Sequence, residues 1–536
     1  MRLKFWMLAL ICLPVLLAET FNNHAVRLDS GGKLVSWVQP QSQAYDRVMR
    51  LAWDYLLDRV PTESNGLKTF YSYCCLDPDK MHGTAWPHNP AGLYAMLSDS
   101  AAAYYAYSGD RRVVDLVRGL LDYQIAHGTA PRSWKWGGVP YASSNHGDTD
   151  YRGAYEFQYD TKHPGRGDGY GVIEPDKAGE LGAAYLRFYK LTGEIRYRDA
   201  GLACADALAN NIRPGTADQS PWPFRVYAET GIVREQYSAN VIGPIRLFDE
   251  AISLGTPRAA AYKDARATAW KWLMSFPMKN NIWANYFEDI PIMDKLWNMN
   301  QYSPMEAARY MMDHPELDPD WREHATGLIG FVEKTFAVDV AKKGEIEAAT
   351  GIQWGAEAIS EQLDYLPKMG SHTSRYGSVL ARWAELTGDE AALEKGFRAL
   401  NWASYMCRED GVVNDQPKLE HAGIWFSDGY GDYIRHFMAA LGSAPQWAPE
   451  GQNHLLRSSS MVSDVQYGPD RIAYRTFDTT STEVIRLAFT PGAVLAKGET
   501  LGKRDDLKAP GWTFDPKTNV LRIRHARSKE ISIARR

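Results

Sequence analysis

Apolar stretches with helical spacing recur along the first 440 or so residues, and each is followed by a short turn and a second apolar stretch. In the clearest copy, residues 379–386 lead into Thr387-Gly388-Asp389, and residues 391–406 follow at once. Glycine ends a helix by adopting a left-handed backbone conformation, and a neighbouring acid or hydroxyl residue caps the next helix. The pattern therefore predicts a series of helical hairpins. Their turns lie at Gly109, Gly193, Gly255, a glycine-free segment near Pro319, Gly388 and Gly442.

Long connections join these hairpins, which recur at intervals of roughly 55 to 85 residues, whereas a solenoid of two-helix repeats has a period of about 34. Short turns at one end and long loops at the other indicate helical pairs closed into a ring. The motifs YSGD, LTGE and LTGD, at residues 107–110, 191–194 and 386–389, give the chain a resemblance to the six-hairpin (α/α)6-toroid enzymes over residues 40–445. That scaffold is found in many glycoside hydrolases and several polysaccharide lyases. The resemblance implies a mainly α protein with an (α/α)6-toroid catalytic domain at residues 19–448.

The pattern changes after Pro449. Short apolar and alternating segments at 464–472, 472–477, 483–489 and 520–525 are separated by Gly-Pro, Pro-Gly and Asp-Pro pairs, which is typical of strands and turns. We expect a small β-sandwich-like domain at residues 455–536.

The first residues have the composition of a signal peptide. A basic start with Arg2 and Lys4 precedes an apolar run over residues 5–17, and Ala18 is a small residue suited to cleavage. The run is too short to span a bilayer comfortably, and no later segment offers about 18 uninterrupted apolar residues. We therefore expect residues 1–18 to be removed, and the mature protein to be secreted or periplasmic without a membrane partner.

Composition and charge exclude some classes of protein. A hydrophobic fraction of 45% is typical of a folded core and not of a disordered chain. The net charge is −5 with no basic stripe, so a nucleic acid partner is not expected. The 18 tryptophans and 30 tyrosines supply flat rings that suit either a core or stacking on sugars.

Four cysteines follow the signal peptide: Cys74, Cys75, Cys204 and Cys407. Four cysteines allow three pairings, among which the sequence does not choose, although adjacent cysteines do not pair with one another without strain. No CxxC motif and no Cys/His spacing typical of a zinc site is present. We therefore interpret the cysteines as structural and expect neither a metal nor a cofactor.

The long connections concentrate aromatic and acidic residues ahead of the first helix of each hairpin. Loops that converge on one rim would form an aromatic-walled cleft, the usual place for a ligand. Asn89-Pro90 and Glu174-Pro175 suit helix starts, so positive helix ends would face the cleft and favour an anionic ligand such as a uronate. The side chains that we expect to bind substrate from these loops are Trp86, His88, Glu174, Trp222, Arg225, Trp354, Trp425 and Tyr430.

Hydrolysis of a glycosidic bond requires two carboxyl groups, an acid for the leaving oxygen and a base or nucleophile. Glu288 and Asp289 lie side by side in an aromatic loop and are the densest candidates. Asp428 in the segment WFSDGYGDY is the next candidate. We expect these three residues to be catalytic, although helix capping explains acids at such positions equally well. The spacing does not distinguish inverting from retaining chemistry.

Elimination at a uronate is the main competing reaction, and it requires a tyrosine or histidine base together with donors for the carboxylate. His372, Arg375 and Tyr376 are spaced i, i+3 and i+4, which would place them on one face of a helix start. They are expected substrate-binding residues in either reaction, and a purely structural role is the third interpretation.

The sequence thus predicts a secreted enzyme that cleaves glycosidic bonds of a poly- or oligosaccharide, including an anionic one, by hydrolysis with paired carboxylates. A polysaccharide lyase is the first alternative. A secreted glycan-binding protein without catalysis is the second, and it would require aromatic platforms without convergent carboxylates.

Overall fold

The computed structural model describes residues 20–64, 66–68, 75–77, 82–83, 89–142, 151, 169–287, 295–296, 298–337, 352–363, 366–414, 425–426 and 428–536. For residues 75–77, 82–83, 352, 425–426 and 428–429 it describes the backbone only. The predicted signal peptide at residues 1–18 lies outside these ranges and stays a prediction. No helix within them is both long and apolar enough to cross a membrane.

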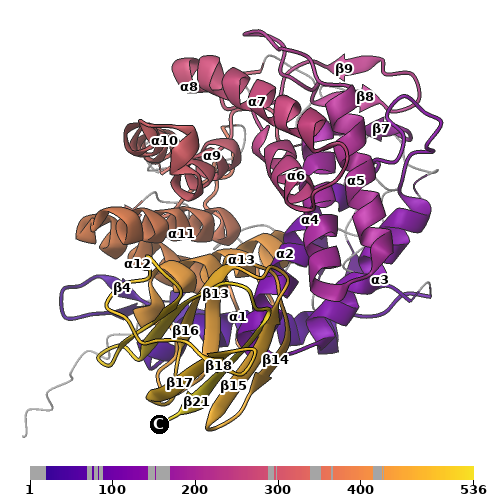
Figure 1. The fold of residues 1–536 in the computed structure, drawn as a ribbon. Helices are drawn as coiled ribbons and strands as arrows, with labels where there is room; N and C mark the ends of the chain where they lie inside the picture. Colours follow the sequence, from indigo (N-terminus) through magenta and orange to yellow (C-terminus); the bar gives the residue numbers. More distant parts are fainter. Residues whose placement is uncertain are drawn as a thin grey trace, which may run out of the picture.

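Helices of the described chain form two concentric layers (Figure 1). Each inner helix contacts the next, and the last contacts the first, so the inner ring is closed. The inner helices are α2 (Pro90–Ser108), α4 (Pro175–Thr192), α6 (Ile242–Ser253), α9 (Tyr302–Asp313), α11 (Gly370–Thr387) and α13 (Asp428–Ser443). The outer helices are α1 (Ala44–Asp54), α3 (Arg112–His127), α5 (Ile195–Asn210), α7 (Ala259–Ser275), α10 (Trp321–Phe336) and α12 (Glu390–Ser404), and a short α8 (Pro277–Asn280) follows α7.

The predicted turn glycines act as helix ends. Gly109, Gly193 and Gly388 follow α2, α4 and α11 with φ of 77°, 76° and 77°, a conformation that glycine adopts without steric cost. The side chain of Asp389 then caps α12 by accepting a hydrogen bond from the Ala392 amide (3.0 Å). The glycine-free copy is also a hairpin, with η4 (Pro315–Leu317) between α9 and α10. The predicted toroid is therefore confirmed.

The sixth helical pair differs from the prediction. Helix α13 continues through Gly442, which is thus not the turn of a hairpin, and the chain passes through η6 (Pro445–Trp447) into the strands that follow. The outer partner of α13 is α1, from the opposite end of the sequence, and α1 continues into the π-helical η2 (Tyr55–Arg59). The ring therefore closes by pairing its first and last helices.

Short strands join the loops at the end of the ring where the inner helices begin. Strand β12 (Trp425–Phe426) pairs with β5 (Cys75–Asp77), which pairs with β6 (His82–Gly83), so the loops before α13 and α2 are linked. Strands β7 (Val172–Ile173), β8 (Arg225–Tyr227) and β9 (Val233–Glu235) form a second small sheet. The remaining pairs are β1 (Thr20–Phe21) with β2 (His24–Ala25), β3 (Arg27–Leu28) with β4 (Leu34–Val35), and β10 (Ile352–Gln353) with β11 (Ala356–Glu357); η1 (Gln41–Gln43) precedes α1.

The C-terminal region is a sandwich of two antiparallel sheets, as predicted. One sheet has the order β13 (His454–Ser458), β16 (Ser481–Arg486), β20 (Val520–His525), β19 (Gly511–Asp515). The other has the order β14 (Val462–Tyr467), β15 (Arg471–Thr476), β21 (Glu530–Arg535), β17 (Pro491–Ala496), β18 (Glu499–Thr500). Alternating apolar residues of both sheets, such as Ile472, Ile523 and Ile533, form its core.

This β-domain packs against the end of the ring that carries the short turns (Figure 1). His454 stacks on Tyr107 near the end of α2, with ring centroids 3.9 Å apart. A Cβ on Gly442 would lie 3.0 Å from the Cβ of Arg457, so α13 approaches β13 closely because this residue has no side chain. The β-domain thus packs against the short-turn ends of α2 and α13.

The space between the two helical layers is filled by aromatic and aliphatic side chains, including the fully buried Trp53, Trp272 and Trp402. Cys204 and Cys407 are unpaired thiols in this core, and burial raises the pKa of Cys204 to about 12. The side chains of Cys74 and Cys75 lie outside the described part of the structure.

Candidate functional site

The first turns of the inner helices gather at the long-loop end of the ring, which we call the rim. Asn89 caps α2 as predicted, because its Oδ1 accepts a hydrogen bond from the Gly92 amide (3.2 Å). Its Nδ2 donates to Oε2 of Glu174 (2.8 Å), the residue before α4. Glu174 makes no capping hydrogen bond of its own. Its carboxylate instead contacts side chains of neighbouring elements.

Glu174 and four other buried charged residues form what we call the acidic cluster. The other four are Asp176, Lys177, Arg225 and Glu235. The Nζ atom of Lys177 lies 3.5 Å from Glu174 and 3.6 Å from Asp176. On β8, Nη1 of Arg225 lies 2.9 Å from Glu235 Oε2, and its Nε lies 3.7 Å from Glu174 Oε1. The structure therefore brings together two predicted substrate-binding residues, Glu174 and Arg225.

Carboxyl groups outnumber cations in the acidic cluster, three to two. Burial raises the pKa of Asp176 to about 7, with Lys177 opposing the shift and Glu174 adding to it. Burial likewise raises the pKa of Glu235 to about 7 against the effect of Arg225. The cluster therefore holds a proton near neutral pH, which is a requirement for acid catalysis.

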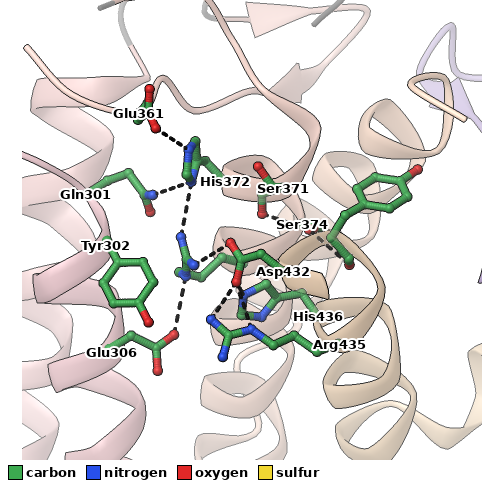
Figure 2. Close-up of polar contacts among 12 residues, drawn as sticks. Gln301, Tyr302, Glu306, Glu361, Ser371, His372, Ser374, Asp432, Arg435 and His436 are labelled. Atoms are coloured by element: carbon green, nitrogen blue, oxygen red, sulfur yellow. Dashed lines mark hydrogen bonds and ion pairs between the residues drawn. The ribbon is translucent and has the colours of Figure 1, made fainter. Parts of the chain in front are cut away.

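A second polar group crosses from the rim toward the axis of the ring (Figure 2). It consists of Glu361, His372, Arg375, Glu306 and Asp432, and we call it the arginine column. His372 Nε2 lies 3.4 Å from Glu361 Oε1, while its Nδ1 lies 3.1 Å from Nη1 of Arg375. A guanidinium can only donate, so Nδ1 is the acceptor and the imidazole proton lies on Nε2, toward Glu361.

Arg375 is fully buried at the centre of this column. Its guanidinium forms ion pairs with Asp432 and, at 3.3 Å, with Glu306, and it lies 4.1 Å from the ring centroid of Tyr302. Burial would raise the pKa of Asp432, but Arg375, Arg435 and His436 together hold that pKa well below its usual value. The ion pair between Arg375 and Asp432 is therefore charged at neutral pH, and it supports the His372 end of the column.

Glu361 is the member of the column that is nearest to solvent, with a side chain 14% exposed. Burial raises the pKa of its carboxyl to about 8, and Arg375 opposes the shift only in part. A carboxyl with this pKa is protonated at neutral pH, so Glu361 is able to donate a proton at the rim.

An aromatic pair lies between the two polar groups. Tyr286 and Tyr302 stack with ring centroids 3.7 Å apart, and Met96 and Phe287 pack against them. Lys177 Nζ lies 3.7 Å from the centroid of Tyr286, and the hydroxyl of Tyr302 donates to Glu180 (3.0 Å). Both tyrosines are buried, so they close the axis of the ring below the rim.

The predicted shared face of His372, Arg375 and Tyr376 is only partly correct. His372 and Arg375 meet in the arginine column, but Tyr376 turns toward α10 and β11, where its hydroxyl donates to Glu333 and Glu357 (2.6 Å each). Burial, reinforced by these two acids, raises the pKa of Tyr376 far above its usual value. Arg375 and Tyr376 are consecutive, so their side chains leave the helix about 100° apart. Arg375 faces the axis of the ring and Tyr376 faces α10 and β11, so Tyr376 is not a base at the rim.

Three aromatic residues that we expected to bind sugar have structural roles. Trp222 is buried and its Nε1 donates to the Leu208 carbonyl (2.9 Å). Tyr430 is fully buried, and its hydroxyl accepts from the Val413 amide (3.1 Å). Trp354 is half-buried against Phe21, with ring centroids 5.2 Å apart. The prediction for Trp222 and Tyr430 is wrong because core packing occupies their ring faces.

Other predicted residues are not covered by the structure. Trp86, His88, Glu288 and Asp289 lie outside the described residues, and so do the side chains of Trp425 and Asp428. The backbone places Asp428 in the first turn of α13 and Trp425 in β12.

Asp176, Glu235 and Glu361 were not singled out from the sequence. Asp176 follows the helix-starting Glu174-Pro175, and Glu361 lies in the long loop before α11, so both carried the positional signal of a rim residue. What the sequence does not show is the burial that shifts the pKa of each carboxyl. Within the described ranges, no group of three or more His, Cys, Asp or Glu side chains is arranged to hold a metal ion.

No protein-family model matches the chain, and no curated protein sequence matches it significantly. Solved structures match in fold. Cellobiose 2-epimerase from Spirochaeta thermophila DSM 6192 superposes with a TM-score of 0.52 and 10% identity, over 76% of this chain and 97% of that one. A sugar epimerase from a ruminal bacterium gives 0.51 and 11%, over 74% and 98%, and a D-mannose isomerase gives 0.50 and 10%, over 75% and 96%. The likeness to six-hairpin toroids is therefore confirmed at the level of the fold.

Proposed function

We propose that the protein is a carbohydrate-active enzyme that hydrolyses glycosidic bonds at the rim, with Glu361 as the general acid. The observation that carries this proposal is the Glu361 carboxyl, whose pKa burial raises to about 8 and which is partly open to solvent. Hydrolysis needs a proton for the leaving oxygen, and a carboxylic acid that is still protonated at neutral pH supplies it.

The column behind Glu361 supports this role. His372 Nε2 lies 3.4 Å from Glu361 Oε1, and its Nδ1 lies 2.7 Å from Gln301 Nε2 and 3.1 Å from Arg375 Nη1. These contacts on Nδ1 fix the orientation of the imidazole beside the Glu361 carboxyl. A fixed donor is more effective than a mobile one because no reorganisation is required in the transition state.

Hydrolysis also requires a base or nucleophile, and we assign it to the other carboxyl groups of the rim. The candidates for this base or nucleophile are Glu174 and Asp176 of the acidic cluster. Glu288 and Asp289, in the loop before α9, are the candidates predicted from the sequence. The cations of the acidic cluster and of the arginine column all lie close to carboxylates. A neutral poly- or oligosaccharide therefore suits the described rim better than the uronate that the helix starts suggested.

Epimerisation or isomerisation of a free sugar is the second candidate. Three of the solved structures with a similar fold are named as two epimerases and an isomerase, and such reactions move a proton at a carbon beside a carbonyl. His372 and Glu361, 3.4 Å apart, are a pair of groups that can exchange a proton. This reaction conserves the number of reducing ends, which separates it from hydrolysis.

Elimination and binding without catalysis have less support. Tyr376 was a candidate base for a lyase, but its hydroxyl lies at two carboxylates away from the rim. A binding protein without catalysis would rely on aromatic platforms, and Trp222 and Tyr430 are buried in the core. With the predicted signal peptide, we propose that the enzyme acts outside the cytoplasm.

The test is incubation of the full chain with a panel of neutral oligosaccharides, uronate oligosaccharides and free reducing disaccharides. New reducing ends on a neutral substrate would support hydrolysis. Epimers or ketoses at constant reducing-end number would support the second candidate, and ultraviolet-absorbing unsaturated uronates would overturn both.

Glu361→Gln should lower turnover by about 100-fold or more, the usual contribution of general acid catalysis. The matched control is Glu323→Gln on the exposed face of α10, which should leave turnover unchanged. Equal activity of the two variants would remove Glu361 from the mechanism.

A further inference from the structure

A cavity of about 280 Å³ lies on the axis of the ring, lined by side chains from five of the six inner helices. Tyr302, which stacks on Tyr286, is part of the lining. Its charged lining includes Asp99, Arg187, Arg246, Glu306, Arg309 and Arg435. The cavity shares Glu306 with the arginine column, but the groups assigned to proton transfer at the rim, Glu361 and His372, do not line it.

Most of the lining residues come from the middle turns of the inner helices. Buried residues such as Ala183 alternate in the lining with partly exposed ones such as Arg187 and Arg309. The partly exposed side chains make the cavity a concave surface that a small molecule can contact.

Most arginines of the lining are neutralised by carboxylates. Arg187 binds Asp99 through two hydrogen bonds of 2.8 and 2.7 Å. Arg246 forms an ion pair with Glu306 (2.6 Å). Arg435 donates through Nε to Asp432 (2.7 Å), beside the cavity.

Arg309 differs from these arginines. Its Nη2 donates to Ser378 Oγ (2.6 Å) and approaches His436 Nδ1 (3.4 Å). Burial lowers the pKa of His436 to about 3, so the imidazole is neutral and supplies no negative charge. Among the described residues, no carboxylate lies within ion-pair distance of Arg309. A partly buried guanidinium without a carboxylate at ion-pair distance is free to bind an anion that enters the cavity.

We propose that the axial cavity binds a small organic oxyanion, a carboxylate or a phosphate ester, with Arg309 as its principal ligand. The planar guanidinium donates in parallel to two oxygens of either group. The volume is close to the lower limit of small-molecule pockets, about 300 Å³, so it leaves room for a small organic anion. Burial lowers the pKa of Arg309, and Glu306 and Asp313 oppose this shift from beyond ion-pair distance.

The experiment is isothermal titration calorimetry of the full chain in a low-chloride buffer, with glucuronate, glucose 6-phosphate and glucose as probes. Both anions, or one of them, should bind saturably with one site per chain, and glucose should not bind to this site. Preference between the two anions distinguishes a carboxylate from a phosphate ester. Calorimetry needs no substrate turnover, so the result is independent of the function proposed for the rim.

Two variants locate the site. Arg309→Gln removes the charge, and Ala439→Met fills the lining from α13 without changing any charge. Arg309→Gln should weaken anion binding by about 10-fold or more, the usual effect of losing one charge-assisted hydrogen bond. Ala439→Met should weaken it by a similar factor, because the longer side chain occupies part of the cavity. Arg322→Gln, on the exposed face of α10, is the matched control and should bind as the unaltered protein does.

Circular dichroism shows whether each variant is folded, and Ala439→Met keeps the test open if Arg309→Gln does not fold. The absence of saturable binding by either anion would overturn the proposal. So would binding that persists in folded Arg309→Gln or in folded Ala439→Met at the affinity of the control.

Discussion

Nη1 of Arg375 donates a hydrogen bond to Nδ1 of His372 at 3.1 Å, and this contact joins the rim to the charged axis of the ring (Figure 2). Because a guanidinium cannot accept a hydrogen bond, Nδ1 must be the acceptor in this contact. The imidazole proton is therefore on Nε2, on the side of Glu361. The ion pairs of Arg375 with Asp432 and Glu306 hold the guanidinium in place. Residues on α9, α11 and α13 thus position one carboxyl group at the rim.

The pH profile of kcat/KM should have an alkaline limb near pH 8. Burial raises the pKa of Glu361 to about 8, so the proton-donating form is present below this pH and is lost above it. Steady-state kinetics between pH 5 and 10 on the substrate found in the panel checks this. In Glu361→Gln the residual activity should lack this limb, and an unchanged limb would assign it to another group.

Asp176→Asn and Glu235→Gln should each stabilise the protein more at pH 8 than at pH 5. The pKa of each carboxyl is raised by burial to about 7 in the folded protein, against about 4 when unfolded. The folded state therefore binds more protons between about pH 4 and 7, and its stability falls as pH rises through this range. A neutral amide does not undergo this loss.

Urea unfolding of these variants at the two pH values measures the difference. Asp218→Asn is the control, since this residue is exposed and lies outside the acidic cluster. A stability change of equal size at both pH values would contradict the shifted titration.

Arg375→Met should destabilise the protein by about 3 kcal/mol or more, because removing one partner of a buried ion pair leaves uncompensated charge. Asp432 and Glu306 are the carboxylates that would lose this partner. The measurement is urea unfolding, with Arg322→Met on the exposed face of α10 as the control. A change below about 0.5 kcal/mol, the range of surface substitutions, would show that the column does not depend on Arg375.

Tyr376→Phe should reduce stability by about 1 to 3 kcal/mol, the cost of leaving buried polar partners unsatisfied, and should leave turnover nearly unchanged. Its hydroxyl donates to Glu333 and Glu357 and does not reach the rim. Thermal unfolding and turnover are measured on the same preparation. A loss of turnover by about 100-fold at unchanged stability would restore Tyr376 as a catalytic base.

Gly442→Ala should lower the thermal unfolding midpoint by loosening the contact between α13 and the β-domain. The added Cβ would lie 3.0 Å from Arg457 Cβ and 3.1 Å from the Leu456 carbonyl oxygen. Gly119→Ala is the matched control within α3, where no atom lies within 4 Å of the added Cβ. That control should stabilise the helix by about 0.5 to 1 kcal/mol. Equal effects at the two positions would show that the close approach at Gly442 is not required.

Local signals determined much of the fold. The left-handed turns at Gly109, Gly193 and Gly388 depend on residues within a few positions of each other, so helix ends and hairpins could be predicted from the sequence alone. The same holds for the change to strands after Pro449, although β13, β17, β18, β19 and β21 lay outside the predicted segments. The asparagine cap at Asn89 and the rim position of the long loops also follow from short-range rules.

Long-range packing decided the rest. The pairing of α1 with α13 joins the two ends of the toroid, and no local pattern encodes which outer helix completes the sixth pair. Burial separated Tyr376 from Arg375, its neighbour in sequence, and placed Trp222 in the core. Burial also raised the pKa of the Glu361 and Asp176 carboxyls, because protein replaces the water around them. The sequence by itself therefore determined the ring of hairpins and the end at which the long loops gather, whereas the tertiary structure alone decided which carboxyl groups hold a proton there.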